Sequence, residues 1–232
     1  MSSAFSACNM SAVYPARYKD RFGEEPTSIQ NHGKTLAMIV RGVEFEGCDL
    51  DCLEPKGKPD PTQLSSFTFL HGSLCFCVIE GDISVPVVTP TGIVNSLLTF
   101  ELELGEPLPT GQMDRERLKV CLTVNEKTYS SEGKTGWFEG EMLDLQGKLP
   151  PGTFMKACIN CAFSDYSPYG HGLFGNLICF RANKAGYLAL PSGEDFDKDP
   201  YFAVMETVSE MVQETHLCPE FERRAPGTGY RG

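Results

Sequence analysis

Apolar and polar residues alternate along several short segments between residues 36 and 124. In "VEFEG" (43–47) and "LTFELEL" (98–104), apolar side chains take every second position and polar side chains take the positions between. A period of two is typical of a strand with one buried and one exposed face. The segments "FTFLHGSLCFCVIEG" (67–81) and "LKVCLTV" (118–124) are similarly rich in β-formers. The pattern predicts about six short strands in an antiparallel sandwich or a strongly curved sheet.

The N-terminal residues lack this alternation. Residues 1–34 mix Ser, Pro, Gly and charged residues, so we expect an irregular segment ahead of the domain. Within it, Tyr14, Tyr18 and Phe22 recur at every fourth position. That spacing fits one side of a short helix, whose start is limited by Pro15.

Two segments of the second half have helical spacing instead. In "WFEGEMLDLQGKLP" (137–150), apolar residues recur at spacings of four and three before Pro150, which indicates a short amphipathic helix. In "DPYFAVMETVSEMVQETHLCP" (199–219), Asp199 is suited to an N-cap and Pro200 to the first turn. The apolar face of this second helix would carry Phe202, Met205, Val208, Met211 and Val212.

Between the helices lies a predicted β-hairpin. Its strands are "GTFMKACINCAF" (152–163) and "GLFGNLICFRA" (172–182), and the turn-rich "SDYSPYGHG" joins them. We therefore expect one α+β domain over residues 35–232, mainly of antiparallel β structure. Its β-rich part is 35–125, and the helices, the Cys-rich hairpin and the tail occupy 137–232.

Charge limits the classes of partner. The net charge is −11, and residues 1–116 hold 16 acidic against 8 basic residues. An acidic surface repels phosphate backbones and anionic lipids, so we expect neither nucleic-acid nor membrane binding. A basic protein is the partner that this charge favours, for example a toxin neutralised by an immunity-type protein. No apolar run of membrane-spanning length and no convincing signal peptide is present, so we expect a cytoplasmic protein.

Four of the ten cysteines have a spacing that suits a metal. Cys158 and Cys161 form a CxxC, Cys179 follows in the partner strand of the hairpin, and Cys218 follows the second helix. Together they can supply a tetrahedral, closed and therefore structural zinc site, with His216 or His171 as substitute ligands. Two alternatives remain open: buried free thiols, or a thiol or metal active site.

The remaining paired cysteines have weaker signals. Cys75 and Cys77 lie in a predicted strand and face the same side, which favours two core thiols. Cys48 and Cys52 lie among acidic residues in "EGCDLDCLEP". Because no cation is there to activate them, we interpret them as structural or incidental.

A binding surface is predicted around the hairpin turn and the tail. The candidate residues are Asp165, Tyr166, His171, Arg181, Tyr230 and Arg231. These observations favour a non-enzymatic protein-binding module with a structural zinc ion, and we assign no catalytic residue. The alternative is a metal-dependent hydrolase or other enzyme with its site near Asp165, His171 and His216.

Three long motifs carry a resemblance: "FEGEMLDLQGKLPPGTFMKAC", "CINCAFSDYSPYGHGLFGNLICFR" and "VQETHLCPEFERRAPGTGYRG". With them the chain resembles an uncharacterised family of bacterial proteins, a domain of unknown function. The resemblance extends over roughly residues 30–232 and is densest in the last hundred. It implies a soluble bacterial protein and no particular activity.

Overall fold

The structure is a computed structural model that describes residues 12–32, 35–166, 177–190 and 199–228, with only the backbone of 199–201. The main sheet consists of β1 (Ala12–Asp20), β2 (Gly23–Asn31), β3 (Leu36–Val40), β4 (Val43–Gly47), β5 (Glu54–Pro55), β8 (Cys77–Thr89), β9 (Gly92–Leu104), β10 (Glu116–Val124), β11 (Lys127–Ser130) and β12 (Phe154–Met155). A two-stranded sheet pairs β6 (Thr68–Leu70) with β7 (Ser73–Cys75), and a three-stranded sheet contains β13 (Ser164–Asp165), β14 (Leu177–Cys179) and β15 (Glu210–Val212). The helices are α1 (Pro61–Leu64), α2 (Phe138–Lys148), α3 (Lys184–Leu188) and α4 (Asp199–Met205), with 3₁₀ turns η1 (Cys158–Asn160) and η2 (Arg181–Asn183).

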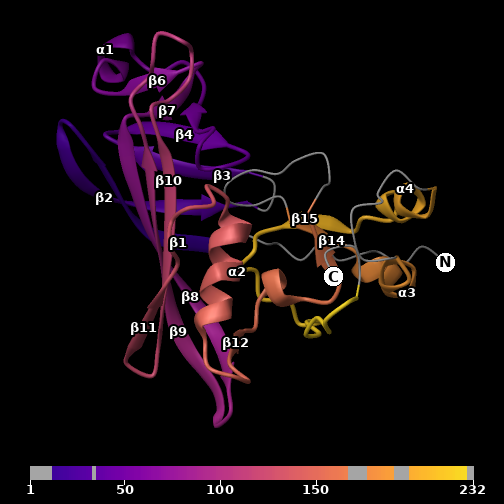
Figure 1. The fold of residues 1–232 in the computed structure, drawn as a ribbon. Coiled ribbons are helices and arrows are strands. Elements are labelled where there is room, and N and C mark those ends of the chain that lie inside the picture. Colours follow the sequence, from indigo (N-terminus) through magenta and orange to yellow (C-terminus); the bar gives the residue numbers. More distant parts are fainter. Residues whose placement is uncertain (1–11, 33–34, 167–176, 191–198, 229–232) are drawn as a thin grey trace.

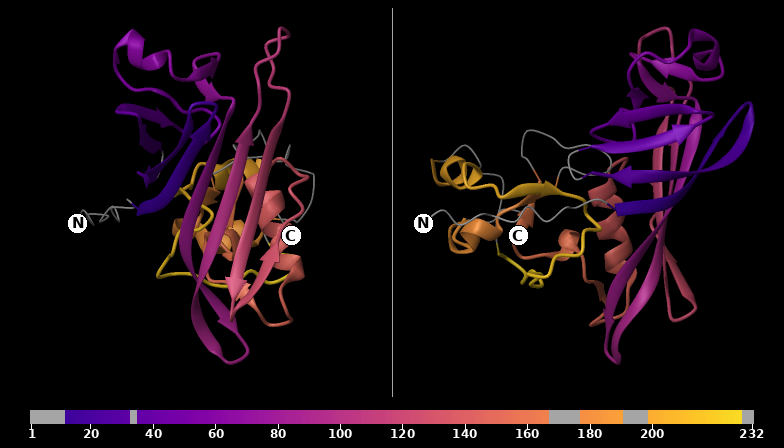
Figure 2. Two further views of the ribbon diagram at one scale, coloured as in Figure 1. Left: turned by 90° about the vertical axis from the view of Figure 1, so that its left-hand side faces the viewer. Right: turned by 180° about the vertical axis from the view of Figure 1, so that it is seen from behind.

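The main sheet is antiparallel and strongly curved (Figure 1). Its strand order is β11-β10-β9-β8-β1-β2-β3-β4-β5, and β12 pairs with β8 on the same side as β1, near the end of β8 that β1 does not reach. Helix α2 and the C-terminal region lie on one face of this sheet. The view onto the opposite face of β8, β9 and β10 shows no described element in front of them (Figure 2). Around β8, β9 and β10, the described residues therefore cover one face of the sheet and leave the other face open.

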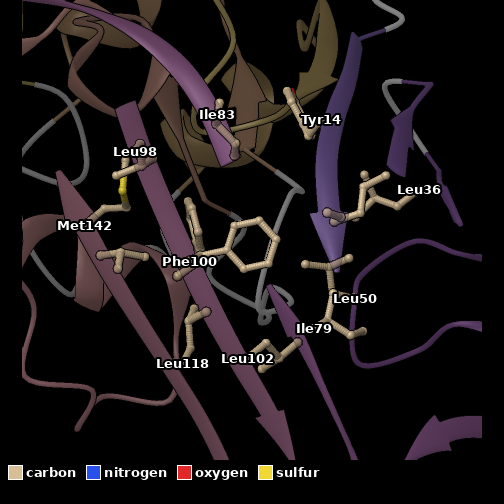
Figure 3. Packing of buried hydrophobic residues seen from close by; sticks show 14 of the residues in the cluster. Tyr14, Leu36, Leu50, Ile79, Ile83, Leu98, Phe100, Leu102, Leu118 and Met142 are labelled. Carbon is tan, nitrogen blue, oxygen red and sulfur yellow. The ribbon is translucent and has the colours of Figure 1, made fainter. Parts of the chain in front are cut away.

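Alternating side chains build the core on the packed face. Along β8, and along β9 from Ser96 onward, every second residue is buried, and Ile79, Leu98 and Leu102 are fully buried. Phe100 extends among them in Figure 3, opposite Gly81 on the neighbouring strand. A Cβ at position 81 would lie 2.3 Å from the Phe100 ring, so glycine leaves the space that the ring fills.

The predicted fold class is confirmed. The strands expected between 36 and 124 form, and the expected helix at 137–150 is α2. Phe138, Met142 and Leu145, its three periodic apolar residues, are fully buried. Within the described residues, no helix is long and apolar enough to cross a membrane.

The expectation of an irregular N-terminal segment is wrong for residues 12–31, which form β1 and β2. Residues four apart share one face of a strand as well as one side of a helix, so Tyr14 and Tyr18 are both buried within β1. Pro15 is tolerated because β1 pairs with β8 only at residues 16–19, so the ladder on that side does not include it.

Two predictions for the C-terminal region also require correction. The long helix predicted at 199–219 ends at Met205, and Glu210–Val212 form β15 beside β14. The predicted strand 152–163 contains the turn η1, so the hairpin is short and pairs Ser164–Asp165 with β14. At 210–212, pairing with the distant strand β14 has overridden the local apolar spacing.

Candidate functional site

The C-terminal region is assembled around β14, the central strand of the three-stranded sheet. Cys179 of β14 is opposite Ser164 on one side and Glu210 on the other. The turn η1 docks against the segment after β15, because the amide of Cys158 donates to the carbonyl of His216 at 3.0 Å. Segments distant in sequence are thereby brought to one place (Figure 1).

The four cysteines of the predicted metal site lie in this assembly. Cys158, Cys161 and Cys179 are buried, and Cys218 is half-buried. Burial raises the pKa of the Cys158 thiol, and the negative charges of Cys161, Cys218 and Cys179 raise it further. All three other thiols therefore lie within electrostatic range of Cys158. Among the described side chains, however, no group of three or more His, Cys, Asp or Glu is arranged to hold a metal ion.

An ion pair borders the cysteines. Arg181 contacts Glu210 at 2.5 Å, and it also hydrogen-bonds the Cys218 thiol. Near this pair, burial lowers the pKa of His216, which favours its neutral form. Arg181, one of the predicted binding residues, is therefore half-buried and already engaged with neighbours in the protein.

A buried polar network connects β13 with segments from the rest of the C-terminal region. The Tyr187 hydroxyl donates to Asp165 Oδ2 at 2.5 Å, and Arg224 Nη2 donates to the Tyr187 oxygen at 3.0 Å. The Tyr166 hydroxyl donates to Glu214 Oε1 at 2.7 Å. Asp165 is 2% exposed and Glu214 is 0% exposed. Two carboxylates are thus held inside the C-terminal region by tyrosine hydroxyls.

These positions change the interpretation of the predicted binding residues. The side chains of Asp165 and Tyr166 are buried, so in the described structure they stabilise the interior and do not form an exposed surface. His171, Tyr230 and Arg231 lie outside the described residues. Asp165 accepts hydrogen bonds from Tyr187 and from the Tyr166 amide, and the charges of Glu210 and Arg181 act on His216. The alternative enzyme site stays a prediction.

Tyr187, Glu214 and Arg224 were missed by sequence reasoning. Each lies 22 to 60 positions from a network partner, and no local motif connects them. The one signal in the sequence is the tight grouping of Ser, Asp and Tyr at 164–166, which is equally typical of a turn.

A second feature is a groove of about 530 Å³ on the open face of the main sheet. Its floor is formed by β1, β8, β9 and β10, and β2 contributes Pro26 at its edge. The charged side chains that line it are Arg17, Glu80, Asp82, Glu101, Arg117 and Lys119. Positive and negative groups are equally represented, so the groove does not share the acidic excess of the whole chain.

Four of these charges form a row across the sheet. The register places Arg17 opposite Glu80, Glu80 opposite Glu101, and Glu101 opposite Lys119. Arg17 Nε donates to Glu80 Oε2 at 3.0 Å. The order across the strands is therefore cation, anion, anion, cation, with two glutamates side by side at the centre.

A family model, described as a family of unknown function (DUF6304), matches residues 12–164. The match contains the whole main sheet, α2, Cys158 and Cys161, and it ends before Cys179 and Cys218. It covers the groove completely and the C-terminal region only in part. No curated protein and no solved structure matches the chain. Since the match spans more than half of the sequence, the chain belongs to this family of unknown function.

Proposed function

We propose that this protein is a non-enzymatic binding module that holds a partner protein on the open face of its main sheet. The observation that carries the proposal is the pair of directly opposed glutamates, Glu80 and Glu101, at the centre of the groove. Like charges directly opposite one another on neighbouring strands are unfavourable. A lysine or arginine of a partner, placed between the two carboxylates, would relieve that repulsion.

The flanking cations restrict the partner. Arg17 and Lys119 stand on either side of the glutamate pair, so a broad cationic surface would meet repulsion at both ends of the row. A single protruding Lys or Arg within a neutral or acidic rim fits this order of charges better. The proposed partner is thus a protein that inserts one basic side chain. This is a more specific class of partner than the generally basic protein expected from net charge.

The test compares two double variants with the same change in charge. Glu80→Gln/Glu101→Gln alters the groove, and Glu44→Gln/Glu46→Gln alters acidic residues of β4, which Lys56 contacts. Proteins retained by the immobilised full chain are identified and quantified by mass spectrometry at low and high salt. We expect one partner protein whose retained amount falls by at least about tenfold with the groove variant and is unchanged with the β4 variant. High salt should also reduce the amount retained by the unaltered chain. Equal retention by the two variants would contradict the groove assignment.

We also propose that zinc, bound by Cys158, Cys161, Cys179 and Cys218, holds the C-terminal region together. Support comes from the donor set of four thiols. They belong to η1 and the residue after it, to β14 and to the segment after β15, and the charges of the other three raise the pKa of Cys158. Four protein ligands close the coordination sphere, which is the arrangement of structural zinc. Binding would require the thiols to lose their protons and the side chains to converge.

Metal analysis of the purified chain tests this second part. We expect about one zinc per chain, lost in Cys158→Ser and in Cys218→Ser and retained in Cys121→Ser, whose thiol hydrogen-bonds Ser130 in the main sheet. The protein should be purified without an immobilised-metal column. Zinc-free wild-type protein that is as stable as zinc-supplemented protein would show that the four cysteines are buried free thiols.

A further inference from the structure

Cys48 and Cys52 bring their sulfur atoms to 3.2 Å of each other in the turn between β4 and β5. The two thiols share a hydrogen bond, and the amide of Asp49 donates to the Cys52 sulfur at 3.0 Å. A disulfide bond is about 2 Å long, so a small side-chain rotation would bring the two sulfurs into bonding distance. The acidic surroundings in the sequence did not indicate this proximity.

The turn that carries the two thiols is held in place by the core and by close backbone packing. Leu50, between the two cysteines, and Leu53, just after them, are buried, with exposures of 1% and 0%. Gly47 packs so closely that a Cβ there would lie 2.3 Å from the carbonyl oxygen of Cys52. The backbone therefore holds the two cysteines together before any bond forms, which lowers the entropic cost of closing the ring.

The two thiols differ in access. Cys48 is exposed, and Cys52 is half-buried. Burial, followed by the hydrogen bond and the charge of Cys48, raises the pKa of Cys52 to about 12. A reagent from solution therefore reaches Cys48 first. Once Cys48 is modified, its hydrogen bond and charge no longer suppress ionisation of Cys52.

We propose that Cys48 and Cys52 form a thiol–disulfide exchange site that closes into an intramolecular disulfide when it meets a small disulfide such as oxidised glutathione. The Cys48 thiolate attacks one sulfur of the small disulfide, forms a mixed disulfide and releases one thiolate. The Cys52 thiolate then attacks the Cys48 sulfur and expels the second. Two protein thiols are oxidised and one small disulfide is reduced to two thiols, which take up the two protons.

The experiment uses the reduced full chain and oxidised glutathione at mildly alkaline pH. Samples are quenched with acid, free thiols are blocked with N-ethylmaleimide, and the protein is digested with a protease that cleaves before aspartate. Cleavage before Asp49 and Asp51 places Cys48 and Cys52 on separate peptides, residues 20–48 and 51–59, each with no other cysteine. We expect these two peptides to appear joined, and to separate on reduction.

Serine variants distinguish the two steps. Cys52→Ser should stop at one glutathionyl group on Cys48, and Cys48→Ser should leave Cys52 at least about tenfold less modified than Cys48 in the wild-type protein. Cys121→Ser serves as the control and should give the joined peptides at the wild-type rate. A wild-type protein that keeps glutathione on Cys48, or that joins Cys48 to another cysteine, would overturn the proposal. So would a Cys48 that reacts no faster than Cys121.

Discussion

Arg41 donates two hydrogen bonds to the carboxylate of Asp20, from Nη1 to Oδ2 and from Nη2 to Oδ1, each 2.7 Å long. A third bond from Nη1 reaches the carbonyl of Ser66 at 2.9 Å, and the guanidinium lies 5.4 Å from the ring of Phe67. Asp20 ends β1, Arg41 lies in the turn after β3, and Ser66 precedes β6. One side chain thus ties together three segments far apart in sequence.

Replacing Arg41 should destabilise the fold because it leaves a buried carboxylate without its partner. The Asp20 side chain is 4% exposed and that of Arg41 is 20% exposed. We expect Arg41→Met to lower the free energy of unfolding by about 3 kcal/mol, and Arg41→Lys by less, since lysine keeps the charge without the paired geometry. Urea unfolding measures both. Arg115→Met, which removes a mostly exposed cation, should cost less than about 1 kcal/mol.

The same pair predicts a loss of stability in acid. Burial alone would raise the pKa of Asp20, but hydrogen bonds from Arg41 and from the amide of Phe22 outweigh it and lower the pKa. Because the folded pKa lies below the unfolded value, the contribution is complete above about pH 4 and disappears as the pH falls through the folded pKa. Asp20→Asn should therefore flatten the acid limb of stability against pH. Asp82→Asn, an exposed change in the groove, should leave that limb as steep as in the wild type.

Gly81→Ala tests the close packing between β8 and β9. The added methyl group would lie 2.3 Å from the ring of Phe100, which is itself 2% exposed, so the ring must shift within a filled core. We expect a loss of about 1–3 kcal/mol in urea unfolding. Phe100→Leu in the same chain should recover part of it, so the double variant should cost less than the sum of the single ones. As a control, Gly147→Ala in α2 meets nothing within 4 Å and should stabilise by up to about 1 kcal/mol.

Tyr187→Phe tests the buried network of the C-terminal region. Burial, together with the negative charge of Asp165, raises the pKa of Tyr187, so its hydroxyl remains a donor at neutral pH. Removing it leaves Asp165 Oδ2 without that donor, and we expect a loss of about 1–3 kcal/mol by thermal or urea unfolding. Tyr129→Phe, at a half-buried position of the edge strand β11, is the matched control and should change stability by less than about 0.5 kcal/mol. Equal effects would show that the buried Tyr187 hydroxyl contributes no more to stability than the half-buried Tyr129 hydroxyl.

The main sheet was largely predictable because its information is local. Alternation in 98–104 and 118–124 reports which face of β9 and β10 is buried, and the structure places those residues as expected. The spacing of Tyr14 and Tyr18 does not identify the type of element, since residues four positions apart share one side of a helix and one face of a strand equally well. What decides for a strand is the pairing of β1 with β8, about 60 residues away in the chain.

The C-terminal region was predictable only in part. Its hairpin is short, because Ser164 and Asp165 pair with β14 and residues 158–160 form a turn, and the metal site that joins Cys158 to Cys179 stays a prediction. The apolar spacing around Met211 predicted a helix, but Met211 pairs with Ile178 in a sheet. The network of Tyr187 and Glu214 could not be predicted, because its hydrogen bonds join segments that meet only after the three short strands have formed.

Strand β8 also sets an order of events for a chain that is made from its N-terminus. One side of β8 pairs with β9 along its whole length, and its other side is divided between β1 at residues 78–81 and β12 at residues 87–88. During synthesis, the partners β1 and β9 emerge well before β12 does. Until Phe154 and Met155 arrive, the second half of β8 is an open edge with unpaired backbone groups, which can pair with another chain. Between the emergence of β9 and that of β12, this edge of β8 is therefore open to aggregation.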